Sequence, residues 1–160
     1  MAKSKTPRNY TSKQMGDACE MLIASEVTLA GFPAFIVPAN WPQYDVVAQP
    51  KDRAPQRIYV RSRTFKRGSD TFVDFDSTAQ FDWWAIVLLP GDGQTKRRFF
   101  IVPKAIADAR SKRNKPGTKY AHYRYVRQDK VEGAFPEFED NFCLSPTGSP
   151  FAPAPQNCAP

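Results

Sequence analysis

The sequence has little histidine and cysteine, and it has no long apolar run. The single His122 has no nearby cysteine that could share a zinc ion, and the three cysteines are an odd number without the spacing of metal ligands. No stretch approaches the roughly 20 apolar residues that cross a bilayer, and no apolar segment follows the basic N-terminus as in a signal peptide. These features favour neither a zinc site, nor a disulfide framework, nor a membrane protein, and we expect a cytoplasmic location.

Positive charge is abundant but unevenly distributed. The composition, 41% hydrophobic and 13% aromatic over 160 residues, is that of one globular domain. The net charge is +7, and residues 96–130 alone hold 12 basic and two acidic residues, a net +10. Clustered lysine and arginine favour a polyanion such as nucleic acid, because phosphate neutralisation releases counterions. A solvated basic face that aids solubility is the alternative.

Local patterns predict helices at two places and strands between them. Thr11 and Gln14 have the spacing of a capping box, and an apolar face then continues to Gly31, which predicts a helix over 12–30. Pro103 is typical of a helix start and predicts a second helix over 103–113. Short apolar runs predict strands at 32–38, 44–49, 57–65, 72–76, 83–90 and 97–103.

This order of elements predicts a mixed α/β or α+β domain in which helices cover a sheet. The run WWAIVLL, 83–89, is apolar on both faces, as expected for a central strand. We expect a basic N-terminal arm at 1–11, a domain at 12–145 and a disordered tail at 146–160, since the last 17 residues contain five prolines and no charge.

Asp45 lies inside the apolar run YDVVA, 44–48. A buried, unpaired carboxylate costs several kcal/mol or becomes protonated, so Asp45 needs a partner. The partner is either an arginine of the next strand or a divalent cation, since Mg²⁺ prefers carboxylate oxygens, water and phosphate. On that next strand, one face carries Arg57, Tyr59, Arg61, Arg63 and Phe65.

Several short motifs occur in a characteristic order: Gly16-x-x-x-Glu20, AGF at 30–32, YDVVA with Asp45, IYVRSR at 58–63, then FDWWAIVLL and FFIVPKAI. Over residues 13–145 this order resembles the PD-(D/E)XK nuclease superfamily, in its small restriction-, resolvase- and homing-endonuclease-like forms. The resemblance implies a restriction-endonuclease-like α/β/α sandwich with a central mixed sheet, and hydrolysis of DNA phosphodiester bonds with Mg²⁺ or Mn²⁺. It makes Asp45 the central metal-binding acid and Glu20 the helix-borne acid that holds metal-bound water. An ordinary exposed helix glutamate is the alternative for Glu20.

The sequence departs from the family pattern where an acid or amide, one residue and a lysine are expected, because it has Tyr59-Val60-Arg61. A phenol with a pKa of about 10 is a poor ligand for Mg²⁺ at neutral pH. Arg61 can stabilise a phosphate but does not readily give up a proton as a tuned lysine does. Gln56 points to the opposite face of a regular strand and replaces the lost ligand only through a bulge. We therefore expect a weakened or inactive site.

Basic residues in two regions are expected to contact DNA phosphates. In the first, Arg57, Arg61 and Arg63 face the phosphate beside Asp45, with Tyr59 stacking on a sugar or base or bonding to phosphate. The alternative is that these arginines pair with Asp45, Asp74 or Asp76. The second region comprises Arg97, Arg98, Lys112, Arg113, Lys115 and Lys119, with tyrosines interleaved, and a solvated loop is its alternative.

The sequence thus predicts a Mg²⁺-dependent endodeoxyribonuclease, with a non-catalytic nucleic-acid-binding module on the same fold as the alternative. A protein-interaction domain with an acidic partner is a third interpretation. The sequence does not determine the oligomeric state, and a homodimer is one of the alternatives.

Overall fold

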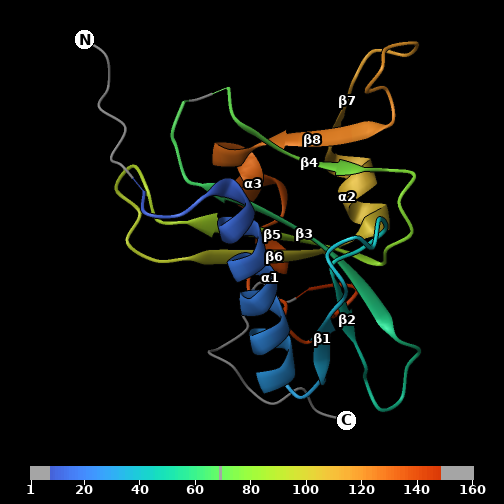
Figure 1. Cartoon of the computed structure of the whole chain (residues 1–160). Coiled ribbons are helices and arrows are strands. Elements are labelled where there is room, and N and C mark those ends of the chain that lie inside the picture. The colour runs from blue at the N-terminus through green and yellow to red at the C-terminus, as the bar shows by residue number, and fades with distance from the viewer. Residues whose placement is uncertain (1–7, 69, 149–160) are drawn as a thin grey trace.

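The computed structural model describes residues 8–68 and 70–148, in which two sheets are stacked with helices (Figure 1). The larger sheet has five strands in the order β1-β2-β3-β5-β6, and the smaller has three in the order β4-β8-β7. The helices are α1 (Ser12–Leu29), α2 (Lys104–Arg110) and α3 (Val131–Ala134). The strands are β1 (Ala34–Ile36), β2 (Val46–Ala48), β3 (Gln56–Thr64), β4 (Phe72–Asp76), β5 (Trp83–Leu89), β6 (Arg98–Pro103), β7 (Lys112–Arg113) and β8 (Tyr123–Arg127).

Helix α1 begins and ends as the sequence predicts. The Thr11 hydroxyl accepts a hydrogen bond from the Gln14 backbone N–H at 3.1 Å, and the Gln14 side chain accepts one from the Thr11 N–H at 2.9 Å. Both bonds satisfy donors that the first helical turn leaves without a partner. At the other end Gly31 has φ 114°, a left-handed conformation that favours glycine. The capping box and the glycine stop are therefore confirmed.

The five-stranded sheet is mixed. Strands β1, β2 and β3 pair antiparallel, β3 and β5 pair parallel, and β5 and β6 pair antiparallel. From Trp83 to Leu88, strand β5 is buried on both faces between β3 and β6, which confirms the expectation from its continuous apolar run.

Each face of this sheet has its own apolar layer. On one face α1 packs through Ile23 and Val27 against strand residues that include Ile58. On the other face Trp84 and Phe100 pack against the three-stranded sheet and against α2 and α3. The predicted α/β class with a central mixed sheet between covering layers is thus confirmed.

Strands β7 and β8 are not predicted by the sequence, and α2 is shorter than predicted. Helix α2 ends at Arg110 rather than Arg113, and Lys112–Arg113 forms β7 instead. In β8, the sequence YRYVR directs Val126 into the core while Tyr123 and Tyr125 are only partly buried. The alternation of apolar and polar residues in this segment is weak, because Val126 is its one apolar inward residue. The high charge of the segment is equally typical of a solvated loop.

The two chain ends of the described region both contact the domain. Arg8, within the predicted N-terminal arm, donates a hydrogen bond to Ser12 at 2.7 Å. Leu144 is fully buried, and Gly148 packs so closely that an added Cβ would lie 2.1 Å from the Glu137 carbonyl oxygen. Residues 1–7 and 149–160, most of the predicted arm and tail, lie outside the described residues. No helix within the described ranges combines the length and apolarity of a membrane span.

Candidate active site

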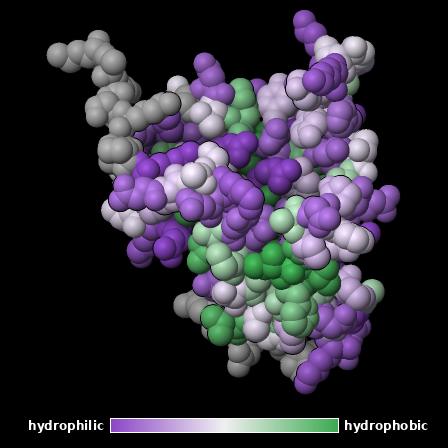
Figure 2. Space-filling model, viewed as in Figure 1, coloured by the Kyte–Doolittle hydropathy of each residue, from purple (hydrophilic) through white to green (hydrophobic). Residues whose placement is uncertain are grey.

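A groove of about 1540 Å³ lies where α1 and the 90–92 loop border β3. Its wall contains the basic residues Arg8, Arg61, Arg63 and Lys66, the acidic residues Glu20 and Asp92, and several small or apolar residues. In the space-filling view, hydrophilic residues cover much of the upper part of the molecule, whereas apolar residues gather lower down (Figure 2). Basic residues thus outnumber acidic ones in the groove, which suits an anionic ligand.

Asp45 directly precedes β2 and is mostly buried. Its Oδ2 atom accepts a hydrogen bond from the Val60 backbone N–H at 2.7 Å and lies 3.8 Å from Nη1 of Arg61. Burial raises the pKa of Asp45, while the Val60 bond and the Arg61 charge oppose that rise. Both partners therefore contact the same oxygen, and Oδ1 is the atom left to face another group.

Glu20 lines the groove from α1. The pKa of Glu20 is raised from 4.5 to about 7, chiefly by burial and then by the nearby charges of Asp45 and Asp17. Arg61 and Lys13 lower it by smaller amounts. The structure thus brings together Glu20, Asp45 and Arg61, three of the four catalytic candidates that the sequence motifs single out; Tyr59 is the fourth.

Tyr59 and Arg61 form one unit. The Arg61 guanidinium lies over the Tyr59 ring, 3.9 Å from its centroid, and donates hydrogen bonds to the Tyr59 hydroxyl and, at 2.8 Å, to the Val60 carbonyl. The Tyr59 ring is buried and stacks on Phe81 with centroids 4.9 Å apart. Burial also raises the pKa of Tyr59 to about 12, so the phenol stays protonated.

Tyr59 therefore does not stack on a base or sugar, as one reading of the sequence had it, because its faces are covered by Arg61 and Phe81. A protonated phenol is also a poor ligand for a hard cation. Its contact with Arg61 suits a positioning residue that fixes the guanidinium at the groove.

Gln56 does not supply the missing ligand. Its Oε1 accepts a hydrogen bond from the Trp83 indole at 2.8 Å, and its Nε2 donates to the Ala54 carbonyl. It also pairs in regular register with Ala48, so the bulge that could turn it toward the site is not formed. Among residues 8–68 and 70–148, no three histidine, cysteine, aspartate or glutamate residues gather as a metal-binding group.

The arginines of β3 separate into two sets. Arg63 lines the groove, bonds to the Phe72 carbonyl at 2.9 Å and lies 3.5 Å from Asp74. Arg57 instead makes two side-chain bonds to Asp82, at 3.0 and 3.1 Å, and is not among the residues that line the groove. The expectation that Arg57 shares the phosphate-facing site thus fails, because Asp82 holds it at the opposite end of the strand.

The second predicted basic region also separates. Arg98 is bound by Glu139 through two bonds of 2.8 Å and by Glu132 at 2.8 Å, which makes it a structural residue rather than a phosphate contact. Arg97 is exposed. Lys112, Arg113, Lys115 and Lys119 are exposed too, on β7 and the loop that follows it.

Sequence reasoning missed two groove residues, Arg8 and Lys66. The sequence places Arg8 in a basic arm without indicating a specific role, and Lys66 directly follows the predicted strand 57–65. The packing of α1 against β3 brings both to the groove. A basic residue just beyond a strand that already carries three arginines was the available signal for Lys66.

No family model matches the chain, and neither does any curated protein sequence. Among solved structures, the chain is similar to a bacterial homing endonuclease, I-Ssp6803I, at 15% identity and a TM-score of 0.54, over 84% of this chain and 90% of that one. It also aligns with Hjc, a Holliday junction resolvase from the archaeal hyperthermophile Archaeoglobus fulgidus, at 19% identity and a TM-score of 0.45, over 76% and 88% of the two chains. At these identities the first likeness shows the fold alone. The chain has the restriction-endonuclease-like fold that the sequence resemblance implies.

Proposed function

We propose that the chain is a DNA endonuclease that hydrolyses phosphodiester bonds with Mg²⁺ or Mn²⁺. The observation that carries this proposal is that Glu20 and Arg61 line a basic groove, while Asp45 contacts Arg61 and raises the pKa of Glu20 through its charge. The fold, which the chain shares with a homing endonuclease, supports it.

The donor set fits a hard divalent cation. Mg²⁺ is commonly held by one or two carboxylates, with water and substrate phosphate in the other positions. Glu20 and Asp45 are two such carboxylates, both are partly buried, and the charge of Asp45 acts on Glu20. Ionising two neighbouring carboxylates costs free energy because their negative charges repel each other. A bound cation offsets this repulsion. A bound cation would polarise a phosphate oxygen and lower the pKa of an attacking water.

The remaining groups act on the phosphate. Arg61, held by Tyr59 and the Val60 carbonyl, presents a fixed guanidinium that stabilises the negative charge developing on phosphate oxygens. Arg8 and Lys66 contact the neighbouring backbone phosphates and hold the DNA in the groove. Asp45 and Glu20 supply the oxygen ligands, and the Val60 N–H fixes the orientation of the Asp45 carboxylate.

The site is weakened relative to the family pattern. Arg61 takes the place of a lysine and does not act as a base, and general-base help is typically worth about 10² to 10⁴ in rate. We therefore propose slow turnover. The same substitution favours a second candidate, a nucleic-acid-binding module without catalysis, in which Arg61 serves only as a phosphate contact.

Nicking of supercoiled plasmid DNA with Mn²⁺ or Mg²⁺ separates the two candidates. Slow nicking by the wild type that is abolished in Asp45→Asn and Glu20→Gln supports the nuclease. The exposed loop residue Asp52 gives the matched control, since Asp52→Asn should nick at the wild-type rate. Absence of nicking in all four proteins, with DNA binding retained, supports the binding module instead.

A further inference from the structure

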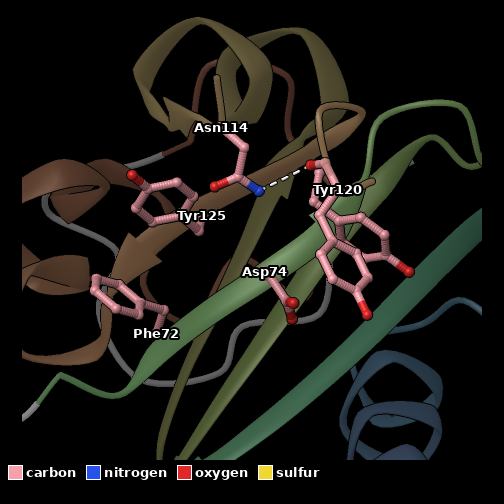
Figure 3. Close-up of a pocket in the computed structure, with 6 residues that line it drawn as sticks. Phe72, Asp74, Asn114, Tyr120 and Tyr125 are labelled. Atoms are coloured by element: carbon pink, nitrogen blue, oxygen red, sulfur yellow. Dashed lines mark hydrogen bonds between the residues drawn. The ribbon is translucent and has the colours of Figure 1, made fainter. Parts of the chain in front are cut away.

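A second cavity, of about 520 Å³, lies on the outer face of the three-stranded sheet (Figure 3). Its size is within the range of small-ligand sites. Its lining residues are the aromatic Phe72, Tyr120, Tyr123 and Tyr125 and the polar Asp74 and Asn114. The proposed nuclease chemistry uses none of them.

Strand alternation explains why these rings face outward. On β4, Val73 and Phe75 belong to the core, so Phe72 and Asp74 between them point to the other face. On β8 Val126 belongs to the core and its neighbour Tyr125, which pairs with Asp74, points outward. The aromatic residues are thus a separate cluster that the core does not require, and clustered exposed apolar side chains mark interaction sites.

The rings form two walls with a carboxylate between them. The rings of Phe72 and Tyr125 meet edge to face with their centroids 5.1 Å apart. Those of Tyr120 and Tyr123 do the same at a centroid distance of 5.9 Å. In the close-up, Asp74 lies between Phe72 and Tyr125 on one side and Tyr120 on the other (Figure 3). Asn114 donates a hydrogen bond to the Tyr120 carbonyl at 2.8 Å and ties the loop to β7.

Cations flank these walls. Lys119 lies 5.3 Å from the centroid of the Tyr120 ring, and the exposed Lys115 directly follows Asn114. Aromatic faces beside basic groups are the chemistry that binds unstacked bases and their phosphates. A carboxylate inside the cavity repels phosphate, so the base is the part of a nucleotide that suits the interior.

The cavity and the groove share a wall. Asp74 lines the cavity and lies 3.5 Å from Arg63, which lines the groove. Arg63 also bonds to the carbonyl of Phe72, a cavity residue. A strand of DNA held along the groove therefore passes beside the cavity mouth.

We propose that this cavity receives one unstacked nucleobase of the DNA bound in the groove, and that Asp74 selects guanine. The inference rests on the proposed function for its DNA substrate. An ionised aspartate is an acceptor only, and guanine offers two adjacent donors, N1–H and the 2-amino group, whereas thymine offers one. The substrate would then be DNA with an unpaired or easily extruded guanine near the cleavage point.

The test is fluorescence anisotropy in EDTA, so that cleavage plays no part. Three short labelled duplexes are compared: one with a single bulged guanine, one with a bulged thymine and one fully paired. The wild type should bind the bulged-guanine duplex about 5- to 100-fold more tightly than the paired one, as expected for one stacked base. Tyr125→Leu should lose this preference, Tyr125→Phe should keep it, and the control Trp41→Leu, at an exposed aromatic residue elsewhere, should keep it too.

Asp74→Asn should still prefer a bulge but lose the preference of guanine over thymine. Equal binding of bulged and paired duplexes by the wild type overturns this inference and leaves the proposed nuclease intact. A bulge preference that survives both Tyr123→Leu and Tyr125→Leu also overturns it, since the base then binds elsewhere. Failure to bind any of the duplexes at low salt overturns the proposed function as well.

Discussion

Arg61 lies 3.8 Å from Asp45 but is hydrogen-bonded to Tyr59, whose ring it also covers. The Asp45–Arg61 contact is therefore a long ion pair, and both side chains are partly exposed, at 23% and 33%. Pairs of this kind contribute little to stability. The ion pair with Arg61 therefore gives Asp45 little role in stability, which agrees with the proposed role of Asp45 as a metal ligand.

Asp45→Asn should change the free energy of unfolding of the metal-free protein by less than about 1 kcal/mol. The asparagine carbonyl can still accept the Val60 N–H bond, and a partly buried charge is removed. Asp82→Asn is the matched comparison and should cost about 1 to 2 kcal/mol, because Asp82 accepts two side-chain bonds and one backbone bond from Arg57. Urea denaturation measures both, and a larger loss at Asp45 than at Asp82 contradicts the metal-site assignment.

Glu20 should make stability depend on pH in a defined direction. Its pKa is raised in the folded state from 4.5 to about 7, so between these values the folded protein binds more protons than the unfolded chain. The contribution of Glu20 to the free energy of unfolding therefore falls as the pH rises from 4.5 to about 7. Metal-free Glu20→Gln should match the wild type near pH 4 and exceed it by about 1 to 2 kcal/mol at pH 8, after allowance for solvent screening. Thermal melts across pH test this, and an equal difference at both pH values refutes it.

Arg98 and Arg97 are adjacent basic residues with different expected roles. Arg98→Ala should lower stability by about 1 to 3 kcal/mol, because it leaves Glu132 and Glu139 without their shared partner. Arg97→Ala, at an exposed position, should leave stability unchanged. Denaturation of the two variants gives the comparison, and equal stability would mean that the Arg98 ion pairs contribute nothing.

DNA binding should depend strongly on salt. Four basic side chains line the groove, and contacts to about four to six phosphates give a log–log slope of roughly −4 to −5. Lys66→Ala should weaken binding of all sequences alike and make the slope shallower by about 1. Anisotropy titrations from low to high salt measure this, and a flat response in the wild type removes nucleic acid as the partner.

Restoring the family pattern should raise activity. Tyr59→Glu with Arg61→Lys adds a carboxylate ligand and a base, and the nicking rate should rise by about 10² or more. The melting temperature should fall, because the stack of Tyr59 on Phe81 is lost, so nicking is compared well below the melting transition. A folded double variant that nicks no faster than the wild type would show that these two positions do not limit the chemistry.

The fold was largely predictable, because its signals are local. The Thr11–Gln14 capping box and the apolar run of β5 depend only on neighbouring residues. Glu20, Asp45 and Arg61 could be proposed as site residues because the short motifs that contain them follow one another in the order of the family pattern. The partners of the arginines could not be predicted in the same way. Arg98 bonds to Glu132 and Glu139, which are 34 and 41 residues away, and only the tertiary fold brings them together.

Strand β8 escaped prediction for a related reason. Its outward tyrosines resemble the exposed aromatic residues of a loop, and their role depends on β4, which lies about 50 residues earlier in the sequence and pairs with it. The aromatic cavity forms only through that pairing, so it could not be predicted from sequence patterns.

Metal binding by Glu20 and Asp45 can be measured most directly by soaking a crystal of the protein in Mn²⁺ and locating the metal by its anomalous scattering. If Glu20 and Asp45 hold the metal, a peak should lie between their carboxylates and should be absent from crystals of Asp45→Asn prepared in the same way. Saturating Mn²⁺ without a peak at that position, and with Asp45 closed onto Arg61, would contradict this assignment.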